Sequence, residues 1–299
     1  MDRRSFLGWA ARTVAAAGIA PQIVHDGVFA KEVGLVSKPE LKKALVYGML
    51  PGDLSMEDRF QLAAECGFDG VEAPPVTDRV ECEAMRKAAT AAGIEIHSVI
   101  YGGWGKPLSA PEPKDRQEGE QAVKDALHGA RALGADTLLL VPGRVTEEIR
   151  YQDVYERSQA SIRKLIPTAK RLGVVIAVEN VWNGFLLSPI EFARYVDELD
   201  SPFVQAYFDV GNVIGAFGFS QDWIRTLGPR IRRLHVKDFK LDGRQWTNLL
   251  DGSVNWKEVR KSIEEVGYGG YMTCELGGGD AAYLKDVAAR MDRIITGDL

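Results

Sequence analysis

The sequence predicts an α/β protein with a single (β/α)₈ TIM barrel, and three observations support that prediction. Short apolar segments alternate with amphipathic stretches from residue 43 to residue 276. The amphipathic stretches repeatedly end at a glycine, which readily adopts the left-handed conformation that closes a helix. These glycines are Gly67, Gly93, Gly134, Gly173 and Gly267. Eight strand–helix units within about 250 residues match the usual size of such a barrel.

The predicted strands are five to eight residues long and rich in aliphatic and β-branched residues. In chain order they are 43–50, 70–74, 94–100, 137–142, 174–180, 204–210, 231–238 and 271–276. An open doubly wound sheet is the alternative, but it needs a glycine-rich turn after its first strand to bind a nucleotide. The segment G-M-L-P-G at 48–52 does not supply that turn. The closed barrel is therefore favoured.

Two of the helices and one loop can be placed from local signals. Ser55, followed by acidic residues 57 and 58, is typical of a helix start. Residues 121–133 place alanines and a leucine on one helical face. Residues 101–120 contain three prolines and predict a long irregular loop over the barrel mouth.

Composition excludes several classes of protein. The chain has 299 residues, of which 26% are charged and 45% hydrophobic, which is ordinary for a globular protein. The formal net charge of −5, with no basic block to offset it, argues against a nucleic-acid partner. The three cysteines, Cys66, Cys82 and Cys274, form neither a disulfide framework nor a C-x-x-C zinc motif. We expect them to be buried thiols.

Residues 1–30 resemble a twin-arginine export signal. Arg3-Arg4 and then Phe6-Leu7 precede a weakly apolar, alanine-rich stretch, and V-F-A at 28–30 offers a cleavage site before Lys31. The apolar stretch is too short to span a bilayer, so no stable membrane insertion is expected. We therefore divide the chain into a cleaved signal peptide, residues 1–30, and a barrel domain, residues 31–299. This predicts an exported, periplasmic protein.

Ionisable residues lie at or near the ends of four consecutive predicted strands. Glu179 follows the fifth strand's apolar run, Asp209 the sixth and Glu275 the eighth, and His235 lies within the seventh. In a closed barrel these carboxyl ends are neighbours, so the side chains can converge. Three carboxylates alone would repel one another and take up protons, and a divalent cation removes that conflict. The predominantly oxygen donors suit Mn²⁺, Mg²⁺ or Co²⁺ better than structural zinc.

Four motifs resemble those of the sugar phosphate isomerase/epimerase family, the xylose-isomerase-like TIM barrels that include ketose 3-epimerases and L-ribulose-5-phosphate 3-epimerases. They are V-E-N-V-W-N at 178–183, F-D-V-G-N at 208–212, H-V-K-D at 235–238 and C-E-L at 274–276. The resemblance covers nearly all of residues 43–290. It implies a metal-dependent isomerase or epimerase that acts on a ketose or related sugar, with one divalent ion. Mn²⁺ is the first choice, and Mg²⁺, Co²⁺ or Zn²⁺ are the others.

The resemblance also implies roles for the site residues. Glu179, Asp209, His235 and Glu275 would bind the metal ion. Glu179 and Glu275 would in addition be the catalytic acid/base pair: one removes a proton next to the carbonyl, giving an enediolate, and the other returns a proton to the opposite face. Asn212 departs from the pattern, because ketose epimerases often have a histidine there.

Further residues are predicted to contact the substrate, each with an alternative. Glu72 could bond a sugar hydroxyl or lie on a solvated rim. His97 could contact the substrate, or instead be packed or support a ligand. Trp182 could stack on a sugar or pack the barrel mouth. Lys237 and Asp238 could touch the substrate or form a loop ion pair. The full set is Glu72, His97, Trp182, Asn183, Asn212, Lys237 and Asp238.

The expected partner is a small carbohydrate, and a homo-oligomer is compatible with the sequence. Export favours a free sugar, keto-sugar or glycoside derivative, because sugar phosphates are mostly cytosolic. Two other functions are consistent with the same motifs. One is a lyase or hydrolase that acts on keto-sugar derivatives through the same metal site, and the other is a non-catalytic carbohydrate-binding barrel. A multi-metal endonuclease is disfavoured because the chain has only four histidines.

Overall fold

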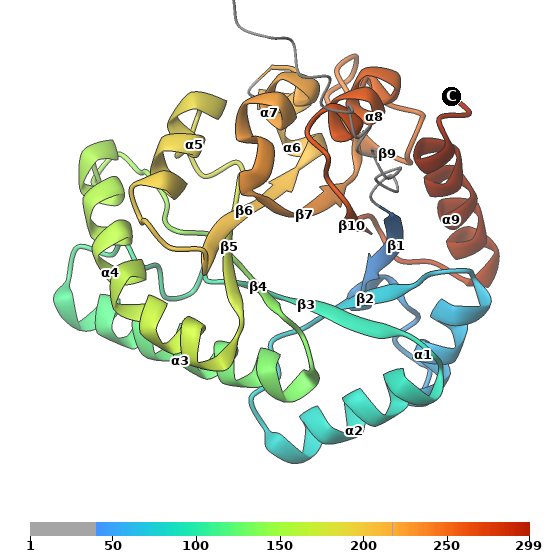
Figure 1. Cartoon of the computed structure of the whole chain (residues 1–299), viewed down its shortest axis with the longest axis horizontal. Coiled ribbons are helices and arrows are strands. Elements are labelled where there is room, and N and C mark those ends of the chain that lie inside the picture. Colours follow the sequence, from blue (N-terminus) through green and yellow to red (C-terminus); the bar gives the residue numbers. More distant parts are fainter. Residues whose placement is uncertain (1–39, 217) are drawn as a thin grey trace, which may run out of the picture. The chain divides into compact units, whose positions relative to one another are not determined.

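The computed structural model describes residues 40–216 and 218–299, which form a closed parallel barrel surrounded by helices (Figure 1). The predicted export signal, residues 1–30, lies outside the described residues. Around the barrel the strand order is β1-β10-β7-β6-β5-β4-β3-β2. The barrel strands are β1 Leu41–Val46, β2 Gly70–Ala73, β3 Glu95–Gly102, β4 Thr137–Leu140, β5 Val175–Glu179, β6 Val204–Asp209, β7 Ile231–Val236 and β10 Gly270–Cys274. The predicted (β/α)₈ barrel is confirmed.

Helices follow the strands along the chain and cover the outside of the barrel. They are α1 Met56–Glu65, α2 Arg79–Ala91, α3 Pro113–Leu133, α4 Tyr151–Leu172, α5 Pro189–Asp197, α6 Val210–Ala216, α7 Ser220–Leu227, α8 Trp256–Glu265 and α9 Ala281–Thr296. The five glycines predicted to end helices all have positive φ, between 67° and 92°. Ser55 accepts a hydrogen bond from the backbone N–H of Asp58, so the predicted cap of α1 is confirmed.

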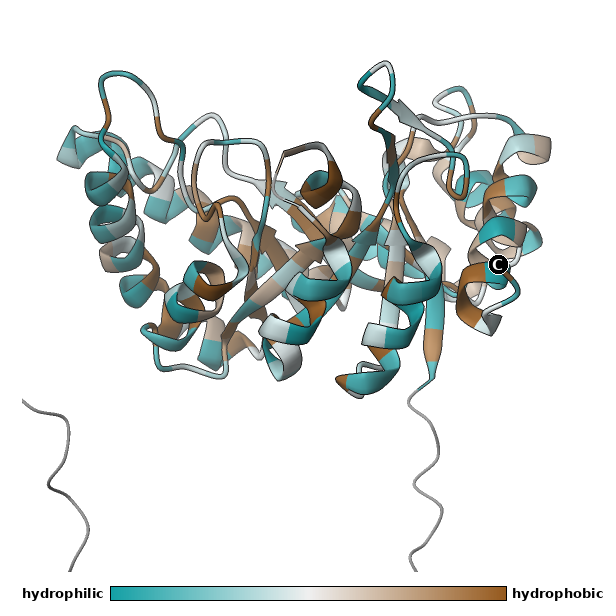
Figure 2. Cartoon of the chain, turned by 90° about the horizontal axis from the view of Figure 1, so that it is seen from above, coloured by the Kyte–Doolittle hydropathy of each residue, from teal (hydrophilic) through white to brown (hydrophobic). Residues whose placement is uncertain are grey.

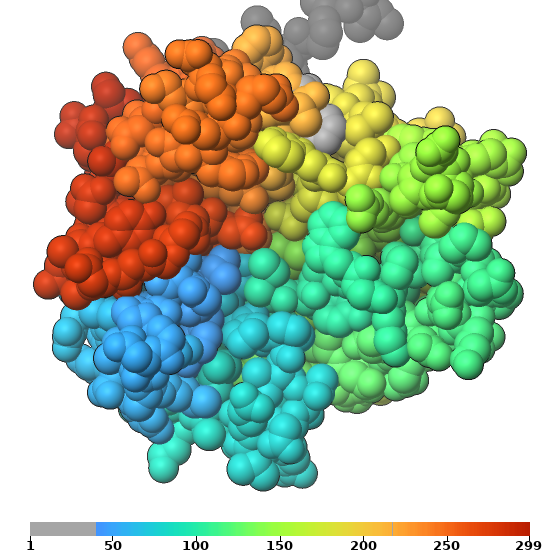
Figure 3. Space-filling model, turned by 180° about the vertical axis from the view of Figure 1, so that it is seen from behind, coloured from blue at the N-terminus to red at the C-terminus, as the bar shows by residue number. Residues whose placement is uncertain are grey.

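The core lies between the strands and the inner faces of the helices. Figure 2 shows brown, apolar colour on the central strands, whereas much of the outer helix surface is teal. The first and last parts of the barrel close against each other, since β1 pairs with β10 from Leu41↔Gly270 to Leu45↔Cys274. In Figure 3 the blue surface of the first strand–helix unit accordingly lies beside the red surface of the last strand–helix unit. All three cysteines are free and buried, as expected.

Two local predictions are wrong in addition to the end of the first strand, which lies at Val46 rather than at residue 50. The long loop predicted at 101–120 is shorter, because β3 continues to Gly102 and α3 begins at Pro113. Proline is favoured in the first turn of a helix, where it sacrifices no hydrogen bond. Arg116 fixes this turn by donating to the carbonyl oxygens of Ala110 and Pro111.

The second correction concerns the seventh strand. It ends at Val236, and Asp238 begins a separate hairpin, β8 Asp238–Lys240 paired with β9 Gln245–Thr247. The D-G pair at 242–243 is a turn signal between these strands. Within the described part of the chain, no helix combines the length and apolar character needed to cross a bilayer.

Candidate metal centre and active site

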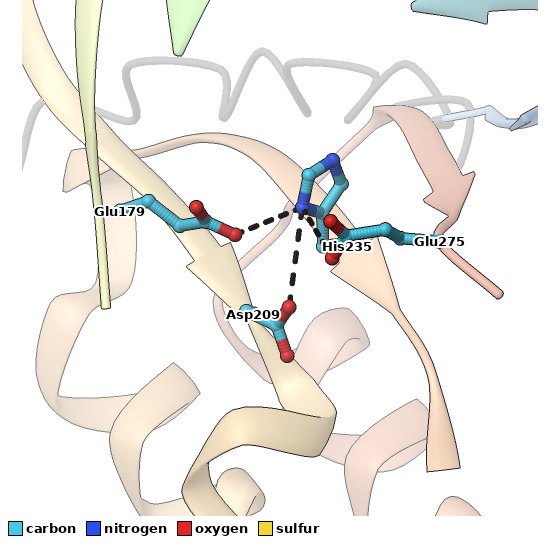
Figure 4. A group of neighbouring side chains, drawn as sticks. All are labelled: Glu179, Asp209, His235 and Glu275. Atoms are coloured by element: carbon cyan, nitrogen blue, oxygen red, sulfur yellow. Dashed lines mark hydrogen bonds and ion pairs between the residues drawn. The ribbon is translucent and has the colours of Figure 1, made fainter. Parts of the chain in front are cut away.

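Four side chains from neighbouring strands converge inside the carboxyl end of the barrel (Figure 4). Glu179, Asp209, His235 and Glu275 each offer a ligand atom, and these atoms all lie within 4.8 Å of one another. The register explains the convergence, because Asp209 pairs with His235 on the adjacent strand. His235 Nδ1 lies 2.9 Å from Glu179 Oε1, 3.5 Å from Glu275 Oε2 and 3.9 Å from Asp209 Oδ2.

The donor set of this centre fits a divalent cation. Glu179, Asp209 and His235 are buried, while the Glu275 side chain is 31% exposed. Asp209 Oδ2 is buried and, although Lys237 Nζ lies 2.9 Å away, accepts no hydrogen bond of proper geometry. Three carboxylates and one imidazole in a low-dielectric site need a compensating positive charge. Oxygen-rich donors of this kind suit Mn²⁺ or Mg²⁺.

Two asparagines hold Asp209 in place. Asn180 accepts from the backbone N–H of Asp209 at 2.8 Å and donates to its carbonyl oxygen at 2.9 Å. The backbone N–H of Asn212 donates to Asp209 Oδ1 at 2.7 Å, and the Asn212 side chain donates to the carbonyl oxygen of Asn180 at 2.9 Å. The structure therefore gives Asn212, a predicted substrate contact, a role in orienting a ligand. The sequence analysis did not select Asn180, although it directly follows Glu179.

Lys237 brings a positive charge to the same centre. Its Nζ lies 2.5 Å from Glu275 Oε2 and 2.9 Å from Asp209 Oδ2. The ammonium group also lies 5.0 Å from the centroid of the Trp246 ring, within cation–π range. Lys237 thus forms ion pairs with two residues of the centre and also lines the neighbouring pocket, and its contact with the substrate stays a prediction.

The surroundings of the two candidate acid/base residues shift their pKa values in opposite directions. Burial raises the pKa of Glu179 to about 7, against the lowering effect of its hydrogen bond to His235. Burial acts in the same direction on Glu275, but the charges of His235 and Lys237 outweigh it and lower the pKa of Glu275. Carboxyl groups whose pKa values are pushed apart are suited to one acid and one base role.

Glu72 lies beside the metal centre, at the end of β2, and is fully buried. Its Oε2 lies 2.6 Å from His235 Nε2, and its Oε1 accepts from Ser98 Oγ at 2.9 Å. The solvated-rim alternative for Glu72 is therefore wrong.

His97 is buried inside the barrel. Its ring stacks on Tyr271 with centroids 4.1 Å apart, and its Nε2 lies 3.1 Å from Thr273 Oγ1. Burial lowers the pKa of His97 well below its ordinary value, so this imidazole is neutral. These contacts match the packed alternative for His97.

Trp182 and Asn183 follow β5 at the barrel mouth. Trp182 donates from Nε1 to the carbonyl oxygen of Asn212 at 2.8 Å, stacks on Trp246 at 5.2 Å and remains 44% exposed. It therefore packs the mouth and still offers a surface to a sugar. Asn183 is buried, donates to the carbonyl oxygen of Gly143 and accepts from the backbone N–H of Phe185. Its NH₂ group thus binds the loop at Gly143, and its amide oxygen binds its own loop.

Asp238 organises a loop away from the centre. Its carboxylate accepts from the backbone N–H groups of Phe239, Leu250, Gly252 and Val254, and from Trp256 Nε1 at 2.8 Å. A Cβ on Gly252 would approach Asp238 Oδ1 to 2.0 Å, so only glycine fits there. These bonds favour a role for Asp238 in holding the loop, rather than the predicted contact with the substrate.

A family model described as xylose isomerase-like TIM barrel matches residues 60–294. The chain belongs to this family. The resemblance in the sequence motifs is thereby confirmed at the level of the family.

Relatives and solved structures agree with the family. SgbU of Escherichia coli (strain K12), provisionally named an L-ribulose-5-phosphate 3-epimerase, is 26% identical over 245 residues, 76% of this chain and 85% of SgbU. UlaE of Escherichia coli O157:H7, named an L-ribulose-5-phosphate 3-epimerase, is 24% identical and matches 76% of this chain and 84% of UlaE.

Two solved ketose epimerases share the fold. A D-psicose 3-epimerase crystallised in the presence of D-fructose has a TM-score of 0.73 at 19% identity, over 86% of this chain and 99% of its own. An L-ribulose 3-epimerase has a TM-score of 0.75 at 15% identity, over 86% and 95%. The prediction of an enzyme of the sugar isomerase and epimerase kind thus agrees with the names of its relatives.

A pocket of about 600 Å³ opens beside Glu275. Most residues that line this pocket were not predicted from the sequence, because many of them lie in the β8–β9 hairpin, the loop after it and α9. The lining residues are Lys237, Trp246, Thr247, Asn248, Glu275, Leu276, Gly277 and Tyr283. Recognition of the hairpin from its D-G turn would have placed Trp246 near the mouth.

Proposed function

We propose that this protein is a divalent-metal-dependent epimerase of an unphosphorylated ketose or related keto-sugar. The observation that carries the proposal is the position of Glu179 and Glu275, which approach the same centre from opposite sides (Figure 4). Inversion of a carbon needs proton removal on one face and proton delivery on the other, so two opposed carboxyl groups suit that reaction. The names of the epimerase relatives support the same choice.

The metal ion would be held by Glu179, Asp209, His235 and Glu275, with Mn²⁺ as the first candidate. When bound, a divalent cation stabilises negative charge that develops on substrate oxygens. The protein's own side chains supply the rest. Asn180 and Asn212 fix Asp209, and Lys237 holds Glu275 on the pocket side of the centre.

Proton transfer is assigned to the two glutamates. The charges of His235 and Lys237 lower the pKa of Glu275, which lines the pocket, so we assign to Glu275 the removal of the proton from the carbon next to the carbonyl. Glu179, whose pKa burial raises to about 7, returns a proton to the other face. The reverse reaction exchanges these roles.

An unphosphorylated substrate is favoured by the charges around the pocket. Of the residues that line it, Lys237 alone is basic, and it is already paired with two carboxylates. The glycine run at 277–279, which follows the last barrel strand, packs on Met49: the Gly279 N–H donates to the Met49 carbonyl oxygen, and a Cβ on Gly278 would approach that oxygen to 2.8 Å. A phosphate dianion would thus meet few free donors here.

A substrate panel tests the proposal. The purified protein, loaded with MnCl₂, is assayed with free ketopentoses and ketohexoses and with their phosphate esters, and the products are separated by chromatography. We expect a 3-epimer from at least one free ketose and slower turnover of its ester. Turnover restricted to phosphate esters would contradict the choice of substrate, and elimination or hydrolysis products would favour a lyase or hydrolase. Sugar binding without turnover would favour a binding protein.

A further inference from the structure

Glu72 cannot reach a sugar in the pocket, because its side chain has no exposed surface and both carboxylate oxygens already have partners. The partner of Oε2 is His235, at 2.6 Å from Nε2. In the barrel order, β1 and β10 separate β2 from β7, so this contact crosses the barrel interior. A carboxylate buried in this way needs a reason beyond packing, since an uncompensated charge is costly to bury.

The two ring nitrogens of His235 face different partners. Nδ1 faces Glu179, Asp209 and Glu275, the other three candidate ligands. Nε2 faces Glu72. A neutral imidazole carries a proton on one nitrogen and a lone pair on the other, and a carboxylate accepts but does not donate. Both nitrogens therefore meet a carboxylate, Glu179 at Nδ1 and Glu72 at Nε2. Because a cation at the centre would take up the Glu179 oxygen, Glu72 is the acceptor that keeps the proton on Nε2 and leaves the lone pair on Nδ1.

We propose that Glu72 is a positioning residue that fixes the tautomer and ring orientation of His235, so that Nδ1 presents its lone pair to a divalent cation. The inference rests on the proposed metal centre and adds a residue outside it. Metal-binding histidines commonly donate their second N–H to a carboxylate, which orients the ring and makes the ligating nitrogen more basic.

The surroundings of the pair make it rigid. Ser98 Oγ donates to the other oxygen of Glu72, and Ser98 and Glu72 are paired residues of β3 and β2. The Tyr207 ring packs against the His235 ring with centroids 4.4 Å apart. Glu72 and the imidazole are therefore held from both sides, so loss of the carboxylate would free the ring to rotate.

Manganese binding tests the role directly. The wild-type protein and its Glu72→Leu and Glu72→Gln variants are titrated with MnCl₂ alone, and free Mn²⁺ is measured by electron paramagnetic resonance. Loss of such an orienting carboxylate typically weakens metal affinity about 10- to 100-fold. We expect a loss in this range for Glu72→Leu and a smaller loss for Glu72→Gln, whose amide oxygen can still accept from Nε2–H.

Glu120→Gln is the matched control. Glu120 is also a buried glutamate, hydrogen-bonded to Ser161 Oγ at 2.8 Å and paired with Lys164 at 2.7 Å, but it lies between α3 and α4. Its variant should bind Mn²⁺ like the wild type. Folded Glu72 variants that also bind like the wild type would overturn the inference. A wild-type protein that binds no Mn²⁺ would instead overturn the metal centre on which it rests.

Nitrogen-15 NMR of the Mg²⁺-loaded wild type shows which ring nitrogen of His235 carries the proton, and it tests the role of Glu72 even if the Glu72 variants do not fold. We expect a protonated Nε2 and an unprotonated, ligating Nδ1 on His235. A proton on Nδ1 with Nε2 free would overturn the role of Glu72.

Discussion

The ammonium group of Lys237 lies 2.5 Å from Glu275 Oε2, at the point where the pocket meets the metal centre. The contact joins a lysine two residues after His235 to the carboxylate on the pocket side of the centre. Together with the charge of His235, it lowers the pKa of Glu275, although burial acts in the opposite direction.

Removal of this charge should change the pH dependence of the reaction. In Lys237→Met the pKa of Glu275 rises, because one of the causes that lower it is gone, while burial still raises it. The acid limb of kcat/KM against pH should therefore shift upward by about one pH unit. Lys237→Arg, which keeps the charge, is the control and should shift less. Superimposable profiles for the wild type and Lys237→Met would show that Lys237 does not tune Glu275.

Loss of a ligand should empty the metal centre without unfolding the barrel. His235→Ala and Asp209→Asn each remove one of the converging donors, and residues at the carboxyl end of a barrel serve function more than stability. Elemental analysis should find clearly less than one divalent ion per chain in both variants, with wild-type circular dichroism. Full occupancy in both would refute the site.

Asp238 should matter for stability. Asp238→Ala leaves four backbone N–H groups and the indole N–H of Trp256 without their acceptor. Unsatisfied buried donors are costly, so we expect a loss of about 3 kcal/mol in the free energy of unfolding, measured with urea. Lys240→Ala, at an exposed position of the same hairpin, is the control. An Asp238→Ala variant of unchanged stability but raised KM would instead support the predicted substrate contact.

The N-terminal segment provides a prediction about processing. Arg3-Arg4, Phe6-Leu7 and the V-F-A site predict that the protein isolated from its host begins near Lys31. Intact mass spectrometry measures this start, and replacement of both arginines by lysine should retain the full-length chain. A full-length chain found only inside the cell would contradict the export proposal.

The sequence was sufficient to predict the barrel and the converging set Glu179, Asp209, His235 and Glu275, because strand periodicity and βα spacing fix which residues share the carboxyl ends. It was insufficient for contacts that cross the barrel. The Glu72–His235 bond joins residues 163 positions apart, and no local pattern distinguishes it from a sugar contact. The bonds of Asp238 were not predictable for a related reason: apart from Phe239, its partners lie 12 to 18 residues later, beyond a hairpin that was not recognised from the sequence.

Isotope exchange tests the central claim, that Glu179 and Glu275 are the acid and base of an epimerisation. The manganese-loaded protein is incubated in D₂O with a ketose that it turns over, and deuterium at the carbon next to the carbonyl is measured by NMR. Glu179→Gln and Glu275→Gln keep the side-chain shape but cannot transfer the proton, which typically costs about 10²-fold or more. We expect deuterium at that carbon with the wild type and its loss in either variant. Turnover of the ketose without incorporation of solvent deuterium would contradict that claim and indicate a hydride shift.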